Sequence, residues 1–114
     1  MELRYYQTSD GRQPFSEWLA ALEDREARAR IRARLDIVQL GSFGDSRPVG
    51  EGVLELRIDW GPGYRVYFAR VGDVVVLLLC GGDKRAQDED IKEAKRYFND
   101  FKLRRATPPS RGRA

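Results

Sequence analysis

Hydrophobic and polar residues alternate between residues 54 and 60, the pattern of a β-strand buried on one face. The apolar positions are Leu54, Leu56, Ile58 and Trp60, and the polar positions are Glu55, Arg57 and Asp59. Gly61-Pro62-Gly63 then forms a typical turn sequence, and beyond it Val66 and Phe68 alternate with Arg65 and Tyr67. The pattern predicts a β-hairpin with one apolar face and arginines on its reverse.

The first part of the chain has helical rather than strand periodicity. A short strand over 3–6 precedes Pro14, a residue suited to the first position of a helix. Apolar residues then recur at helical spacing, at Phe15, Trp18, Leu19 and Leu22. A second helix starts at Glu23-Asp24 with a stripe of Ala27, Ile31, Leu35 and Val38, and ends at the glycines Gly41 and Gly44. These segments predict a helical hairpin.

The rest of the chain completes an α+β domain. We expect a loop over 45–51, then three strands that form an antiparallel meander, the last being the apolar run 74–80 covered on both faces. A C-terminal helix follows, with an apolar stripe of Ile91, Ala94, Phe98 and Phe101. The predicted order is β-α-α-β-β-β-α in one domain over 1–103, and 104–114 is expected to be a basic, disordered tail.

Charge and composition narrow the candidate chemistry. The net charge of +3 is uneven, because residues 102–114 hold five cations and no acid, so the remainder sums to −2. A nucleic-acid site would therefore be a local patch. The chain has no histidine, which removes histidine-based acid–base catalysis and histidine metal ligands. Its lone Cys80 is expected to be a buried thiol, and without a leader or membrane-spanning run we expect a cytoplasmic protein.

The turn positions predict which residues face each other. A turn at 61–63 sets Trp60 opposite Tyr64, Asp59 opposite Arg65 and Arg57 opposite Tyr67. A second turn at Gly72-Asp73 sets Arg65 opposite Cys80, a few residues before Lys84. Arg57, Arg65 and Lys84 would then converge from three segments. A solvated sheet face with a weak Asp59–Arg65 pair is the alternative.

Three segments carry a family resemblance. Residues 48–68 (PVGEGVLELRIDWGPGYRVYF), 77–87 (LLLCGGDKRAQ) and 88–97 (DEDIKEAKRY) together resemble the RelE/ParE toxin superfamily, and within it the HigB-like addiction module killer proteins of type II toxin–antitoxin systems. The resemblance implies a RelE-like fold and ribosome-dependent mRNA cleavage without metal or cofactor. It also implies neutralisation by a helix-turn-helix antitoxin, with DNA contacted only through that antitoxin.

The resemblance assigns roles to particular residues. It implies that Arg57 and Arg65 orient a phosphate and stabilise its charge, and that Lys84 donates a proton or assists electrostatically. The additional RNA-contact candidates are Tyr64, Tyr67, Arg85, Gln87 and Lys92. Tyr64 and Tyr67 suit either stacking on a base or cross-strand packing. Where the best-known relatives carry a tyrosine, this chain has 88–91 (DEDI), and Asp83 suits either a base or a helix cap.

Two other functions fit the same features. A ParE-like inhibitor of DNA gyrase would share the fold without nuclease activity, because a fold does not fix a function. A protein with no activity of its own would use the basic groove only to receive an acidic antitoxin segment. The arginines of the second helix, interleaved with acids, suit a solvated face or a further RNA contact.

Overall fold

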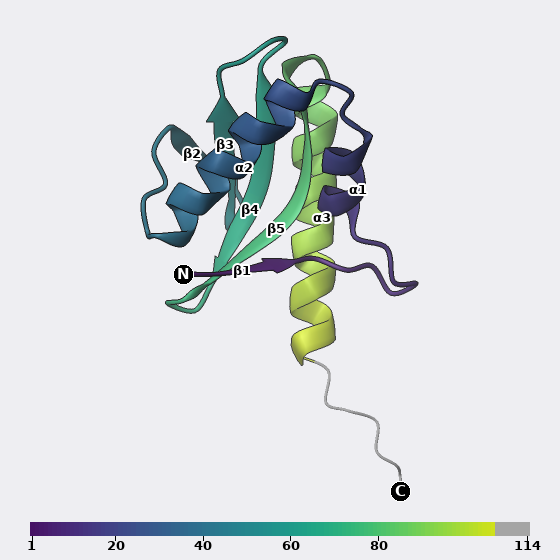
Figure 1. Ribbon diagram of the computed structural model, residues 1–114. Helices are drawn as coiled ribbons and strands as arrows, with labels where there is room; N and C mark the ends of the chain where they lie inside the picture. Colours follow the sequence, from purple (N-terminus) through teal and green to yellow (C-terminus); the bar gives the residue numbers. More distant parts are fainter. Residues whose placement is uncertain (107–114) are drawn as a thin grey trace, which may run out of the picture.

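The computed structural model describes residues 1–106 as a mixed sheet with helices on both faces (Figure 1). The remaining residues of the predicted tail, 107–114, lie outside the described part. The elements are β1 (Glu2–Tyr5), α1 (Pro14–Ala21), α2 (Arg25–Gln39), β2 (Ser46–Gly50), β3 (Val53–Ile58), β4 (Tyr64–Val71), β5 (Val75–Asp83), the short 3-10 helix η1 (Lys84–Ala86) and α3 (Gln87–Ala106). The predicted α+β class is confirmed, and α3 extends three residues into the segment predicted to be a tail.

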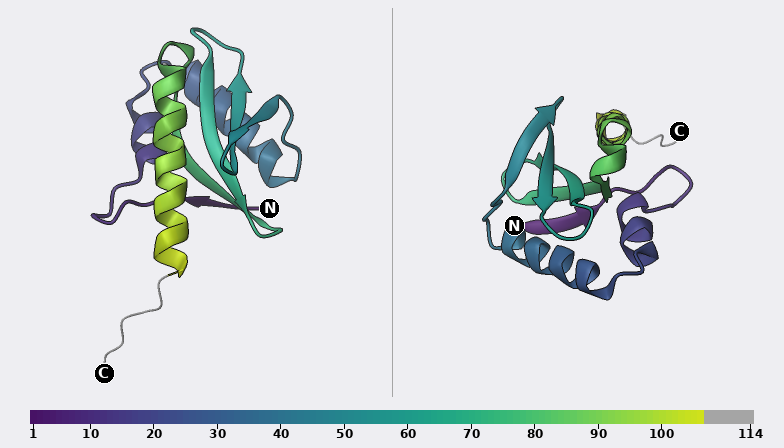
Figure 2. Two further views of the ribbon diagram at one scale, coloured as in Figure 1. Left: turned by 180° about the vertical axis from the view of Figure 1, so that it is seen from behind. Right: turned by 90° about the horizontal axis from the view of Figure 1, so that it is seen from above.

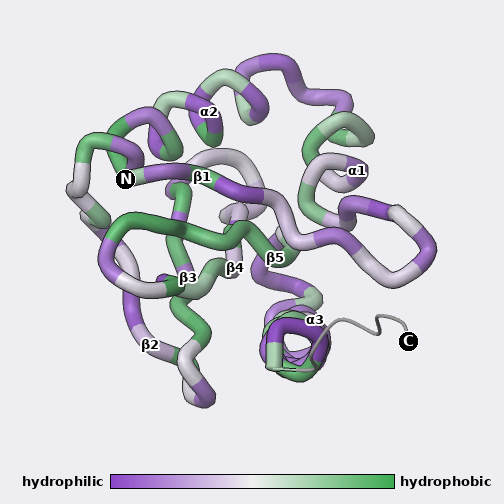
Figure 3. Tube along the Cα trace, turned by 90° about the horizontal axis from the view of Figure 1, so that it is seen from below, coloured by the Kyte–Doolittle hydropathy of each residue, from purple (hydrophilic) through white to green (hydrophobic). Residues whose placement is uncertain are grey.

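The five strands lie in the order β1-β5-β4-β3-β2, with β1 parallel to β5 and the other pairs antiparallel. Helices α1 and α2 cover one face of the sheet and α3 crosses the other (Figure 2). Strand β5 is apolar along most of its length, which suits a strand between two covered faces (Figure 3). Cys80 in β5 is 7% exposed, so the expected buried thiol is confirmed, and burial raises its pKa.

The loop predicted over 45–51 is wrong, because residues 46–50 form the edge strand β2. Strand β2 pairs with a neighbour on one side only, and most of its residues are exposed. It therefore lacks the alternation of apolar and polar residues that marks the inner strands. Pro48 is compatible with this position because an edge strand needs no N–H on its outer side. The structure therefore adds a strand to the predicted order of elements.

The predicted register of the β3–β4 hairpin is also wrong. Ile58 pairs with Tyr64 and Arg57 with Arg65, so the loop spans 59–63 instead of 61–63. Trp60 lies in this loop, where its indole Nε1 donates to Asp24 Oδ2 at 3.1 Å. The register moves by two residues, which preserves the face of every side chain. The hairpin therefore keeps its predicted faces, but the two arginines oppose each other directly.

Two glycines at the end of β5 let helices approach the sheet from both sides. A Cβ on Gly81 would lie 2.3 Å from Trp18 Cε3 of α1, and one on Gly82 would lie 1.9 Å from Asp90 Oδ2 of α3. Gly82 pairs with Arg65, where Cys80 was predicted. The first pair after the turn is Val71 with Val75, which moves the register by one residue, and the irregularity between Tyr67 and Phe68 moves it by one more. This shift brings Arg65 to the end of β5, where Lys84 follows.

Within residues 1–106, no helix is both long enough and apolar enough to cross a membrane.

Candidate functional site

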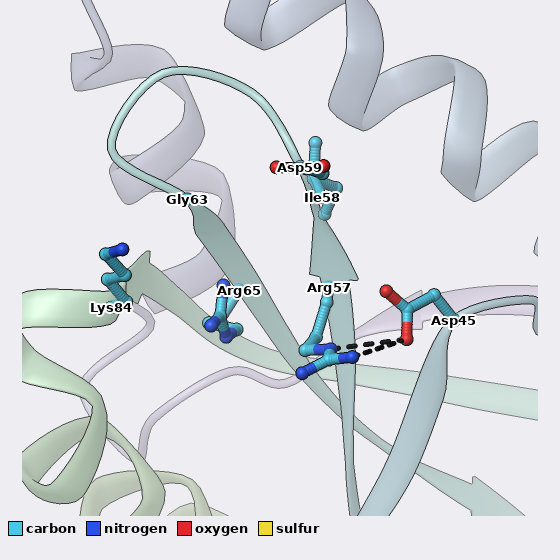
Figure 4. A pocket seen from close by; sticks show the side chains of 7 residues that line it. All are labelled: Asp45, Arg57, Ile58, Asp59, Gly63, Arg65 and Lys84. Carbon is cyan, nitrogen blue, oxygen red and sulfur yellow. Dashed lines mark hydrogen bonds and ion pairs between the residues drawn. The ribbon is translucent and has the colours of Figure 1, made fainter.

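A pocket of about 280 Å³ opens at the end of the β3–β4 hairpin (Figure 4). Arg57 at the end of β3, Arg65 on β4 and Lys84 at the start of η1 all line it. The other lining residues are Asp45, Ile58, Asp59 and Gly63. The three cations singled out from the sequence thus surround one cavity, although the register that brings them together differs from the predicted one.

Arg57 is held at the rim by Asp45, which precedes β2. Its Nε donates to Asp45 Oδ1 at 3.2 Å, and its backbone N donates to the Asp45 carbonyl at 2.9 Å. Its own carbonyl accepts from Arg34 Nη1 of α2 at 2.6 Å, and Arg34 Nη2 also donates to the Phe43 carbonyl. Arg34 therefore fastens α2 to the end of β3, a role that its place in an arginine-rich helix could not reveal.

Arg65 lies deeper in the pocket and is constrained from beneath. Its side chain is 13% exposed, and its Nε lies 3.8 Å from Glu55 Oε1 without a hydrogen-bond partner. Its Nη1 donates to the Tyr64 carbonyl at 3.3 Å. Among the described residues, Arg65 pairs with one carboxylate, that of the buried Glu55. The side of the Arg65 guanidinium that faces the pocket is therefore available to an anion.

Lys84 completes the ring of cations. Its backbone N donates to the Gly63 carbonyl at 2.9 Å, which ties η1 to the hairpin loop. A Cβ on Gly63 would lie 3.4 Å from Arg65 Nη1 and 3.5 Å from Lys84 Cδ, so both side chains pass close to this loop. Lys84 is exposed and makes no ion pair within residues 1–106. The ammonium group of Lys84 therefore has no carboxylate partner among these residues.

A fully buried carboxylate, Glu55, lies beneath the cations. Its oxygens accept from Arg47 Nε of β2 at 2.9 Å, Tyr67 Oη of β4 at 3.0 Å and Gln87 Nε2 of α3 at 2.8 Å. Burial alone would raise the pKa of Glu55, but the hydrogen bonds from Arg47, Gln87 and Tyr67 outweigh it and hold the pKa below its usual value. In the sequence, nothing distinguishes Glu55 from the other polar positions of its strand.

The RNA-contact candidates are dispersed. Tyr64 is 8% exposed and packs edge-on against Trp18, on the sheet face opposite Arg65. Tyr67 is fully buried against Glu55, and burial raises its pKa, so it serves as a neutral donor. Both tyrosines therefore take the packing alternative, because α1 and α3 cover the faces on which a base would stack.

The polar candidates also differ in position. Gln87 is bound to Glu55, as described above. Arg85 is 80% exposed and its guanidinium pairs with Asp83 at 2.8 Å, while Lys92 is 76% exposed and lies 3.6 Å from Glu89. Neither Arg85 nor Lys92 lines the pocket. Both side chains are accessible, whereas the half-buried Gln87 supports Glu55.

Several carboxylates are candidate proton acceptors. Asp83 caps η1 by accepting from Arg85 N at 2.9 Å. The hydrogen bond from the Arg85 guanidinium, followed by that from its backbone N, lowers the pKa of Asp83. Asp90 has a buried Oδ2 without a hydrogen-bond partner, and burial, followed by repulsion from nearby carboxylates, raises its pKa to about 6. Neither residue lines the pocket, whereas Asp45 and Asp59 do. Within the described residues, no cluster of three or more metal-ligating side chains occurs.

The chemistry of this site is that of an anion-binding pocket on an α+β domain. Like charges directly opposite on neighbouring strands repel each other, so the pairing of Arg57 with Arg65 requires a counter-charge. Asp45 and Glu55 supply part of it from the rim and the floor. A bound phosphate or carboxylate would supply the remainder, and guanidinium groups suit either anion.

Comparison with known proteins gives the family. Residues 17–99 match the family described as "Phage derived protein Gp49-like (DUF891)". A Haemophilus influenzae protein with the name "Uncharacterized protein" is 53% identical over 81 residues, which span 71% of this chain and 82% of the relative. The chain therefore belongs to the Gp49-like family, which falls within the RelE/Gp49 group of toxin-like, addiction-module proteins. Its assignment to the HigB-like branch stays a prediction.

Proposed function

We propose that the protein is the toxin of a type II toxin–antitoxin module and that it cleaves mRNA on the ribosome. Family membership supports the toxin–antitoxin assignment. The observation that carries the nuclease proposal is the convergence of Arg57, Arg65 and Lys84 on one pocket. A phosphate gains negative charge in the transition state of cleavage, and cations already fixed around it lower the barrier.

The proposed reaction is an attack within the RNA chain. The ribose 2′ oxygen bonds to the adjacent phosphorus, the bond from phosphorus to the 5′ oxygen breaks, and a cyclic phosphate and a 5′ hydroxyl result. Arg65, supported by Glu55, and Arg57 hold the phosphate oxygens. One group must accept the 2′ hydroxyl proton and another must protonate the leaving oxygen.

We assign the proton acceptor to Asp59 and the donor to Lys84. Asp59 lines the pocket and makes no ion pair within residues 1–106, whereas Asp45 is engaged by Arg57. Lys84 lies across the cavity from the two aspartates (Figure 4). Asp59→Asn is expected to reduce the rate constant of cleavage at saturating substrate and to alter its pH profile, with little change in binding to ribosomes.

The proposal is tested by adding the purified full chain to translating ribosomes and mapping the mRNA ends. We expect cleaved mRNA with the wild type and none with the double variant Arg57→Ala/Arg65→Ala. Arg32→Ala, which removes one exposed arginine from α2 on the other face of the sheet, is the control and should cleave normally. Intact mRNA at concentrations that arrest growth would contradict the nuclease proposal.

A parallel assay separates the gyrase alternative. Inhibition of purified DNA gyrase in a supercoiling reaction, together with intact mRNA, would reassign the protein as a ParE-like inhibitor. If neither target responds and growth is unaffected, the toxin proposal itself fails.

A further inference from the structure

A second hollow lies at the other end of α3, far from the cation pocket. It has a volume of about 440 Å³ and is formed by the last two turns of α3 and the turn between β4 and β5. The helix runs for 20 residues, or roughly 30 Å. It starts directly after η1, whose Lys84 lines the cation pocket, and its last turn lies at the opposite end (Figure 1). The groove and the cation pocket share no lining residue.

The floor of the groove is apolar. Val71, Phe98 and Phe101 line it, and the two phenylalanine rings stack with their centroids 6.4 Å apart. Two adjoining hollows share Phe101 and Arg105 with it, so the apolar surface continues around the end of the helix. An apolar side chain inserted here would bury surface that the fold leaves accessible.

The rim of the groove is cationic and lacks a counter-charge. Lys102 Nζ lies 4.6 Å from the ring centroid of Phe98, and Arg105 Cζ lies 5.6 Å from that of Phe101. Neither cation forms an ion pair within residues 1–106, and no acidic residue lines the groove or its two neighbours. The groove is therefore complementary to an anionic ligand with apolar anchors.

A protein segment fits this combination better than a nucleic acid. Bases bind single-strand sites by stacking on exposed aromatic faces, but Lys102 and Arg105 lie over the rings here. An amphipathic helix places apolar residues and carboxylates on adjacent faces, which matches an apolar floor beside a cationic rim. We propose that this groove docks an acidic, amphipathic segment of the protein that neutralises the toxin. The inference rests on the proposed toxin–antitoxin function.

The test uses the full chain and the product of the reading frame beside its gene, first in a growth-rescue assay and then in a titration of the two purified proteins. The double variant Lys102→Glu/Arg105→Glu is expected to arrest growth, to bind the neighbouring product at least about tenfold more weakly and to escape neutralisation. Arg32→Glu reverses one charge on α2 and should be neutralised normally.

The outcomes separate the two proposals. If the neighbouring product does not neutralise the wild type, the toxin–antitoxin assignment fails and this inference fails with it. If the Lys102→Glu/Arg105→Glu variant is neutralised with unchanged affinity, only the docking inference is overturned. Loss of binding to a uridine oligonucleotide, with partner affinity intact, would make this surface an RNA contact instead.

A milder variant guards against misfolding. Lys102→Gln/Arg105→Gln removes both charges without introducing new ones, and its circular dichroism spectrum should match the wild type. We expect it to weaken partner binding by less than the charge reversal does. Arg57→Ala/Arg65→Ala should keep full partner affinity while losing toxicity, because its substitutions lie at the other end of the molecule.

Discussion

Replacing Glu55 with glutamine would test whether the buried carboxylate supports the site. The substitution keeps the size of the side chain but removes the charge that accepts from Arg47, Tyr67 and Gln87 and that faces Arg65. The new amide brings a donor into a cluster of donors, so at least one hydrogen bond is lost and Arg65 loses its buried counter-charge. A hydrogen bond to a charged group contributes about 1.5–3 kcal/mol.

From these contacts we expect Glu55→Gln to lower the free energy of unfolding at pH 7 by about 2–4 kcal/mol. For a domain of this size that is a fall of roughly 10 °C in Tm. Urea and thermal unfolding, followed by circular dichroism, measure it. Glu51→Gln is the matched control: its carboxylate is 68% exposed and lies 3.7 Å from Lys95, so the change should stay within about 0.5 kcal/mol.

The difference in the free energy of unfolding between the wild type and Glu55→Gln should decrease as the pH falls. The folded state holds the pKa of Glu55 below the ordinary value of 4.5. The stabilisation is therefore complete above pH 4.5 and is lost as the pH falls through the folded-state pKa. Wild type and Glu55→Gln should differ most at neutral pH and converge in acid. A difference below about 1 kcal/mol at pH 7, or one that does not change on acidification, would refute this account.

Three further predictions concern the neighbouring structure. Tyr67→Phe should lower the free energy of unfolding by about 1 kcal/mol, and a double-mutant cycle with Glu55→Gln should show that the two losses are not additive. Gly81→Ala should lower the free energy of unfolding by about 2–4 kcal/mol, because its Cβ would clash with Trp18. The same substitution should cost less in a Trp18→Ala background. Equal costs in the two backgrounds would contradict the packing argument. Asp90→Asn should raise the free energy of unfolding by about 1–2 kcal/mol at pH 7.5, because the folded state raises the pKa of Asp90 to about 6 and so disfavours its charged form above that pH. The gain should vanish below pH 4, where the carboxyl is protonated in both states. Urea unfolding at the two pH values measures the difference.

Much of the fold follows from local patterns. The apolar stripe Ala27, Ile31, Leu35 and Val38 marks the buried face of α2, and all four residues are buried. The alternation in β3 likewise places Leu56 and Ile58 in the core beneath α1 and α2. These predictions are correct because the periodicity of a helix or strand is set by its own backbone geometry.

Features that depend on distant partners could not be predicted in this way. Strand β2 is defined by its pairing with β3 and carries little pattern of its own. The hairpin register differs from the predicted one, and Trp60, which lies in the loop, bonds to Asp24, 36 positions away in the chain. Whether Tyr67 stacks on a base or packs inside the fold stayed open in the sequence, because α3, which covers it, comes much later in the chain.

The same division applies to the candidate site. The alternation of residues along the hairpin is enough to place Arg57 and Arg65 on its reverse face, because a strand's two faces depend only on the parity of its residues. The folded arrangement is needed to show that Arg57 opposes Arg65, that Lys84 joins them at one pocket, and that Glu55 is buried in the same sheet. Register, the loop of the hairpin and the covering helix are long-range contacts, whose energies depend on residues that are remote in the chain.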